Sequence, residues 1–368
     1  MLNTLEKGVA VAKPKAGKVG FALGGLGGFN AFGCGFLQAA RQQEVTPDII
    51  TCTSGMIAWL AKWLDGEDLE HLILEQYQRD TRFPPSLDWL NTLSIVAWFG
   101  SYGITRPAWP EYWARWLTPM TLREELPEQW LDRLLPAQSG VPLRGCEDME
   151  HIADVFNNSS MPVVFSTLHP KSGKAYLHIN EAAQTFLRVS NKEIVPNKEI
   201  GKTVGPQKYT RITPETVGGG LWLLQYGFEN VVQHHLNPLG LVDGVYNRQF
   251  IISELHACDR IYTVRPLNTK WLDHPPRNSV DIVTFILWMW MNSAYTNEIA
   301  GMETVNKLVE DGSLTDPSYK MIELIPVEIE QYYSALLYAH EEKAVYEMAF
   351  NEAMSALQEH KMTVALSG

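Results

Sequence analysis

The first 66 residues alternate between short apolar runs and segments with helical spacing. Residues 19–23 (VGFAL) form an apolar run that ends in glycines, and residues 31–43 (AFGCGFLQAARQQ) suit a helix. Residues 48–51 predict a second strand, and residues 56–66 (MIAWLAKWLDG) a second helix with Gly66 just beyond its end. This strand–helix–strand–helix order predicts an α/β protein with a parallel sheet and helices packed on it.

A glycine-rich loop follows the first predicted strand, in residues 24–35 (GGLGGFNAFGCG). Glycines let the backbone adopt positive φ and let a ligand approach closely. Free N–H groups beside a helix start can hold an anion, either a phosphate or the oxyanion of an acyl-transfer intermediate. By itself the loop is equally well explained as a tight turn that packs a helix on a strand.

A serine stands at the corner between the second strand and the second helix, in residues 52–56 (CTSGM). A nucleophile on such a turn needs small neighbours, and the usual pattern is G-x-S-x-G. Here Cys52 and Met56 occupy the two glycine positions, while Gly55 directly follows Ser54. The helix N-terminus favours negative charge that develops near Ser54. The alternative interpretation is that Ser54 only caps the helix.

An aspartate lies far downstream, in residues 240–247 (GLVDGVYN). An aspartate before a glycine at a strand end is often only a turn residue. A catalytic role for Asp243 requires that it lie beside Ser54 in space, which sequence periodicity cannot show.

These three motifs together resemble the patatin-like phospholipase family of serine acyl hydrolases. The matching stretches are residues 25–37 (GLGGFNAFGCGFL), 46–56 (TPDIITCTSGM) and 243–245 (DGV), supported by residues 162–178 and 257–266. The resemblance covers about residues 18–270. The chain departs from the family pattern at Leu26, Phe29 and Asn30, where glycine, arginine and glycine are usual.

The resemblance implies a three-layer α/β/α fold with a mainly parallel sheet. We expect an N-terminal extension at 1–17, a catalytic domain at 18–270 and a mostly helical region at 271–368. Six of the twelve tryptophans lie in residues 80–140, where we expect a helical insertion that covers the site, although a core role is the alternative.

The resemblance also implies a Ser–Asp dyad, with Ser54 as nucleophile and Asp243 as general base. Backbone N–H groups of the loop Gly25, Leu26, Gly27 and Gly28 would stabilise the oxyanion. No cofactor and no metal ion is expected. His234 and His235 precede the aspartate and are the histidines to consider for a triad, with polar loop residues as the alternative.

The substrate that the resemblance implies is a lipid or other long-chain acyl ester. Leu26, Phe29 and Phe32 would add apolar surface beside the serine. Two alternatives stay open: an acyltransferase on the same fold, and a catalytically weak or silent lipid-binding or regulatory protein.

The charge and composition narrow the other partners. The net charge of −12 argues against a nucleic-acid binder and against attraction to anionic lipid, so peripheral membrane contact would be apolar or local. Four scattered cysteines and an N-terminus without a continuous apolar stretch indicate a cytoplasmic protein. The most apolar run, residues 282–291 (IVTFILWMWM), is too short to span a bilayer and predicts a buried helix or strand. The sequence does not indicate an oligomeric state.

Overall fold

The protein is an α/β protein built on an eight-stranded, mainly parallel sheet. The computed structural model describes residues 17–26, 30–80, 105–107, 140–142, 146–202, 209–226, 237–268, 270, 275–276, 279–316, 319–329 and 342–367. The expected extension therefore lies outside the described residues, apart from Gly17.

The sheet has the strand order β10-β9-β1-β2-β5-β6-β7, with β8 paired to β5. From β10 to β5 all neighbours are parallel, whereas β5 pairs antiparallel with both β6 and β8. The strands are β1 (Val19–Leu23), β2 (Ile49–Cys52), β5 (Val163–His169), β6 (Lys174–Ile179), β7 (Tyr209–Arg211), β8 (Val242–Asp243), β9 (Arg260–Arg265) and β10 (Glu323–Glu328).

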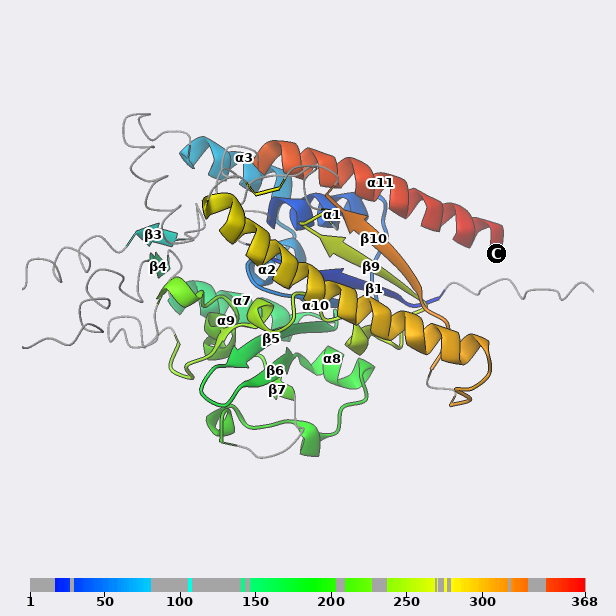
Figure 1. The fold of residues 1–368 in the computed structure, drawn as a ribbon, viewed down its shortest axis with the longest axis horizontal. Helices are drawn as coiled ribbons and strands as arrows, with labels where there is room; N and C mark the ends of the chain where they lie inside the picture. The colour runs from blue at the N-terminus through cyan, green and yellow to red at the C-terminus, as the bar shows by residue number, and fades with distance from the viewer. Residues whose placement is uncertain are drawn as a thin grey trace, which may run out of the picture.

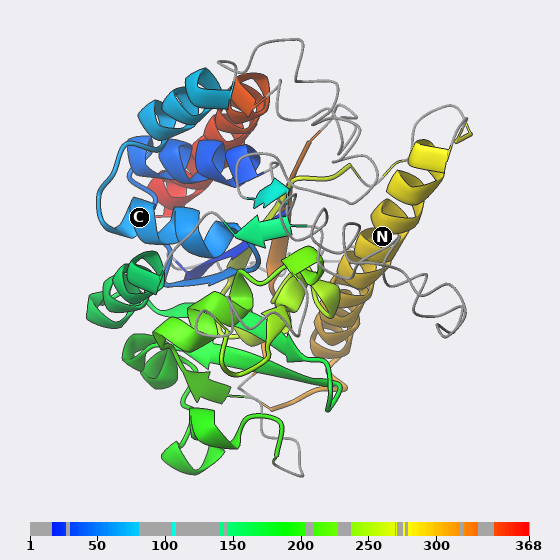
Figure 2. The same ribbon diagram turned by 90° about the vertical axis from the view of Figure 1, so that its left-hand side faces the viewer.

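Helices cover both faces of this sheet (Figures 1 and 2). One large apolar cluster joins one face to α1 (Asn30–Gln42), α2 (Met56–Leu64), α3 (Leu69–Asp80), α7 (Cys146–Asn158), α9 (Pro214–Gly220) and α11 (Glu342–Ser367). A second cluster joins the other face to α8 (Glu181–Phe186) and α10 (Ser279–Glu310). Short 3-10 turns are η2 (Asn191–Glu193), η3 (Asn197–Glu199), η4 (Leu224–Tyr226), η6 (Gly244–Tyr246) and η7 (Ser253–Leu255).

Burial on both faces explains the continuous apolar runs of the strands. Every residue of β1 and β2 is buried, as expected for parallel strands between two helical layers. Among the helices, α1 and α11 approach closely at Gly35, where an added Cβ would lie 2.4 Å from the carbonyl oxygen of Tyr346. The small residues of α1 thus let the C-terminal helix pack directly onto the helix that follows the glycine loop.

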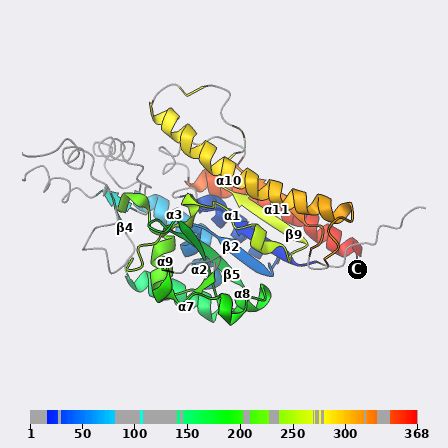
Figure 3. The same cartoon turned by 60° about the horizontal axis from the view of Figure 1, so that its bottom comes forward.

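The predicted strand–helix–strand–helix start is confirmed. The prediction of burial for residues 282–291 is wrong in part. The run lies in α10, yet Ile282, Ile286 and Met289 are each about half exposed or more, at 49%, 59% and 50%. Their spacing places them on one side of the helix, and the N-terminal part of α10 extends beyond the sheet (Figures 2 and 3).

The tryptophan-rich insertion lies almost entirely outside the described residues. Within it, β3 (Thr105–Pro107) pairs antiparallel with β4 (Gly140–Pro142), and β4 lies beside η4. The helical cover over the site stays a prediction. No described helix is long and apolar enough to cross a membrane.

Candidate active site

Ser54 occupies a strained corner between β2 and α2. Its φ of 54° lies in the left-handed region, which costs a residue with a Cβ of order 1–3 kcal/mol. The N-cap of α2 is Gly55, not Ser54, so the alternative interpretation of Ser54 as the helix cap is not supported.

Met56, the last residue of the corner, is accommodated by a glycine of helix α1. Met56 stands where glycine is usual in such turns. Gly33 of α1 faces it, and an added Cβ on Gly33 would lie 2.5 Å from the Met56 sulfur. The glycine that the corner lacks is thus supplied by the neighbouring helix, which keeps the backbones close together.

Sheet topology places Asp243 next to the corner. Strand β2 pairs with β5 only as far as Cys52, which lies opposite Phe165. Beyond that point β8 takes over the same edge of β5, with Asp243 opposite Thr167. Since the other edge of β5 is filled by β6, Asp243 occupies the position that the next residues of β2 would have reached. The turn at Ser54 makes room for the aspartate.

The Asp243 carboxyl group is fully buried and poorly compensated. Its Oδ1 accepts a hydrogen bond from the Val245 N–H at 2.9 Å, whereas Oδ2 has no well-formed hydrogen bond within the described part of the chain. Burial raises the pKa of Asp243 to about 7, and interactions with the Ser54 hydroxyl, the Val245 N–H and the Ser54 backbone only partly oppose this rise. Ser54 therefore lies close enough to Asp243 to lower the pKa of its carboxyl group, although Oδ2 has no well-formed hydrogen bond within the described residues.

The start of the glycine loop is fixed against the serine corner. Gly24 donates its N–H to the Val264 carbonyl oxygen at 3.0 Å, and Gly25 donates to Thr53 Oγ1 at 3.1 Å. An added Cβ on Gly25 would lie 2.1 Å from the Thr53 carbonyl oxygen and 2.8 Å from the Ser54 Cβ. The glycine at position 25 is therefore required by close packing on the corner.

Two of the four expected oxyanion donors are already engaged. The Gly25 N–H bonds to Thr53, and the Leu26 N–H donates to Asn30 Oδ1 at 3.3 Å. Gly27, Gly28 and the neighbouring Phe29 lie outside the described residues. In this state, Gly25 and Leu26 hold the loop in place and do not present their N–H groups to a substrate.

Sequence reasoning missed Asn30 as a site residue. In the sequence it is only a departure from the family pattern, yet in the structure it is 98% buried at the start of α1 and bridges the loop to the corner. Its Oδ1 accepts the Leu26 N–H, and its Nδ2 lies 2.0 Å from the position of an added Cβ on Gly55. A polar side chain in place of a loop glycine, directly before the helix that the sequence predicts at 31–43, is the signal that could have identified it.

Histidine does not complete a triad among the described residues. His178 lies on β6 and bonds Thr167 through Nε2 at 2.7 Å and Thr210 through Nδ1 at 2.5 Å. Burial lowers its pKa to about 3, so the ring is neutral and joins β5, β6 and β7. His234 and His235 lie outside the described residues. Phe32 does not add surface beside the serine, because it is fully buried in the core.

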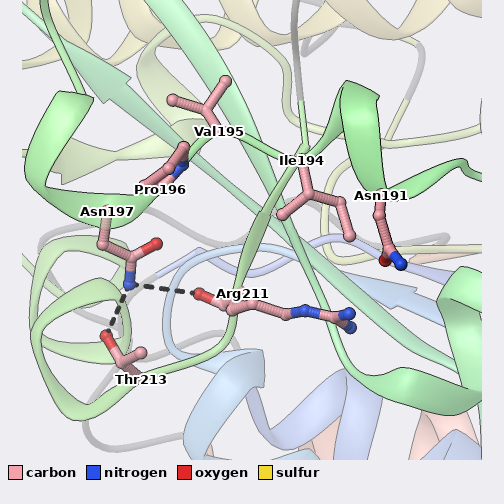
Figure 4. Close-up of a pocket in the computed structure, with 7 residues that line it drawn as sticks. All are labelled: Asn191, Ile194, Val195, Pro196, Asn197, Arg211 and Thr213. Atoms are coloured by element: carbon pink, nitrogen blue, oxygen red, sulfur yellow. Dashed lines mark hydrogen bonds between the residues drawn. The ribbon is translucent and has the colours of Figure 1, made fainter.

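A separate pocket of about 440 Å³ opens at the far edge of the sheet (Figure 4). Ile194, Pro196 and Arg211 are among its lining residues, and the Asn197 side chain donates to the Arg211 carbonyl oxygen and to Thr213 Oγ1. None of the residues at the serine corner lines this pocket. It is therefore distinct from the site around Ser54.

The sheet thus brings Asp243 next to the Ser54 corner, and a serine beside a buried carboxyl group is an arrangement in which the carboxylate can take the hydroxyl proton. No protein-family model matches the chain, and no curated protein matches it at a significant level.

Proposed function

We propose that this protein is a serine acyl hydrolase of the patatin-like kind, with Ser54 as nucleophile and Asp243 as general base. The observation that carries the proposal is the contact between a strained serine and a buried carboxyl group whose Oδ2 has no well-formed hydrogen bond within the described residues. The class of substrate, a lipid acyl ester, follows from the resemblance of the three motifs to that family.

In the first half-reaction, the Ser54 oxygen forms a bond to the ester carbonyl carbon as its proton moves to Oδ2 of Asp243. The tetrahedral intermediate then collapses, the bond to the alcohol breaks, and the proton on Asp243 goes to the departing alcohol. In the second half-reaction, Asp243 takes a proton from the water that attacks the acyl carbonyl carbon. The bond between that carbon and the Ser54 oxygen then breaks, the proton on Asp243 returns to Ser54, and the acid leaves. A carboxyl group with a pKa of about 7 suits both directions of this proton transfer near neutral pH.

The oxyanion requires donors that are aimed at the corner. The N–H of Gly55 directly follows the nucleophile, which is one usual source in such turns, and the Asn30 amide lies beside it. The N–H groups of Gly27 and Gly28 stay candidates from the sequence. Loss of one donor typically costs about 2.7–4 kcal/mol of barrier, so the number that a bound substrate engages decides the rate.

One observation favours the alternative of a catalytically silent protein on the same fold. The N–H groups of Gly25 and Leu26, which the family resemblance assigns to the oxyanion, are occupied by Thr53 and Asn30. A silent protein would keep the serine corner as a packing feature and would bind acyl lipid without turnover. The two functions differ in whether Ser54 becomes covalently modified.

A fluorophosphonate probe separates these possibilities. The wild-type protein should form a covalent adduct and Ser54→Ala should not, while Ser172→Ala, in the turn between β5 and β6, should label like the wild type. Labelling that persists in Ser54→Ala would place the nucleophile elsewhere, and absence of labelling in the wild type would favour the silent protein.

The substrate is then defined by a series of nitrophenyl esters of increasing chain length, run beside phospholipid and neutral-glyceride vesicles. A strong preference for acetyl esters would contradict the lipid class while keeping the serine hydrolase. Product analysis with and without an acceptor alcohol distinguishes hydrolysis from acyl transfer.

A further inference from the structure

Arg265, the last residue of β9, is a fully buried cation with little compensation. Its exposed fraction is 0%, and its closest charged partner is Glu328, whose Oε1 lies 3.5 Å from Nη1. The guanidinium stacks over the Tyr295 ring at 4.2 Å from the centroid. Its Nε and Nη2 have no hydrogen-bond partner in the part of the chain that the structure describes.

A second arginine, Arg248, is only partly buried, with 19% of its side chain exposed, and has much closer carboxylate partners. Arg248 donates to both carboxylate oxygens of Glu254, at 3.0 and 2.8 Å, and to Glu298 at 3.0 Å. A buried charge without such partners costs several kcal/mol, and apolar replacement of a buried ion pair is often neutral or stabilising. Arg265 therefore weakens the fold where Arg248 supports it, and a role in binding would account for its presence.

The unpartnered side of Arg265 has the shape of an anion receptor. Nε and Nη2 lie on one edge of the planar guanidinium, and their two parallel N–H groups form a fork that fits two oxygens of a phosphate or carboxylate. Burial lowers the pKa of Arg265 from its ordinary value, and Glu328 opposes this change. The group stays cationic at neutral pH, because an arginine cannot readily lose its proton in a protein.

Arg265 is the last residue of β9, so it lies at the carboxyl ends of the parallel strands. The carbonyl oxygen of Val264, one residue earlier, accepts the Gly24 N–H that starts the glycine loop. Ring contacts continue from Tyr295 to Phe250, and an added Cβ on Gly24 would lie 2.5 Å from Phe250. Ligands of open α/β sheets bind at this end of the strands, so the arginine lies where a ligand is expected.

We propose that Arg265 is the receptor for a phosphate group, bound side-on by Nε and Nη2 at the carboxyl end of β9. The phosphate belongs either to a lipid head group or to a small soluble phosphate. The guanidinium is fully enclosed, so the ligand has to displace a neighbouring side chain. Binding is then expected to be slow, and titrations are incubated to equilibrium. This site does not depend on catalysis by Ser54.

The test compares Arg265→Met with Arg248→Met in the full-length protein. Thermal unfolding should show an unchanged or higher Tm for Arg265→Met and a lower Tm for Arg248→Met, which leaves Glu254 and Glu298 without their cation. Calorimetric titration with inorganic phosphate and with glycerol phosphate, and sedimentation with phosphatidylcholine and diacylglycerol vesicles, then measures binding. Arg265→Met should bind phosphate ligands at least about tenfold more weakly than the wild type.

Two further results complete the test. Glu328→Gln should bind phosphate more tightly than the wild type, because it removes the anion nearest to the guanidinium. Binding of soluble phosphates would identify a small ligand, whereas binding only of phosphatidylcholine vesicles, lost in Arg265→Met, would identify a lipid head group.

The proposal is overturned if the wild type binds none of these phosphates, or if Arg265→Met retains binding. A loss of Tm as large as that of Arg248→Met would also overturn it, because Arg265 would then be a structural cation.

Discussion

Replacement of Asp243 by asparagine should stabilise the protein, and by an amount that grows as the pH rises from about 4 to about 7. In the folded protein burial raises the pKa of Asp243 from 3.8 to about 7, whereas in the unfolded chain it returns to its ordinary value. The folded state thus holds a proton that the unfolded state releases, so Asp243 costs stability increasingly as pH rises from about 4 to about 7. Each pH unit of pKa difference corresponds to about 1.4 kcal/mol, which gives a penalty of about 4 kcal/mol above pH 7.

The assay is urea unfolding of wild type and Asp243→Asn at pH 5 and pH 8. Asp243→Asn should gain up to about 4 kcal/mol over the wild type at pH 8 and much less at pH 5. The same variant should label about 10²–10⁴-fold more slowly with fluorophosphonate, because it cannot accept the Ser54 proton. In the wild type, labelling should rise with pH and level off above about pH 7, as Asp243 ionises.

Asp154→Asn, a change at an exposed position of α7, is the control and should leave both the pH dependence and the labelling unchanged. The reasoning is refuted if Asp243→Asn is no more stable than the wild type at pH 8, or if its advantage is the same at both pH values. Either result would mean that the carboxyl group is solvated or paired in solution.

Three more substitutions test the corner. The free energy of unfolding of Ser54→Gly should be about 1 kcal/mol higher than that of Ser54→Ala, because glycine adopts a φ of 54° without strain. Equal stability of the two variants would show a relaxed turn. Gly25→Ala should lose probe labelling and about 1–3 kcal/mol of stability, since its Cβ would lie 2.1 Å from the Thr53 carbonyl oxygen; normal labelling would contradict this packing. Asn30→Ala should cost about 1–3 kcal/mol in urea unfolding, because it leaves the Leu26 N–H without its acceptor, whereas a neutral result would remove Asn30 from the site.

The amino-acid sequence determined the elements and the position of the serine. Apolar runs between glycines specify buried strands, and the small-residue turn before an apolar helix specifies a corner at Ser54. These are local properties, because φ/ψ preference and burial periodicity act within a few residues of each other. The antiparallel pair β5–β6 could be predicted for the same reason, since its turn signal lies between the two strands.

The tertiary structure alone decided what surrounds that serine. Asp243 reaches the corner because β8 fills the edge of β5 that β2 leaves, and no local pattern encodes which distant strand takes that place. The engagement of Gly25 by Thr53, the bridge through Asn30 and the unpartnered edge of Arg265 likewise arise from contacts between segments. Hydrogen-bond satisfaction and burial depend on neighbours brought together by folding, so the sequence could name the serine but not the state of its partners.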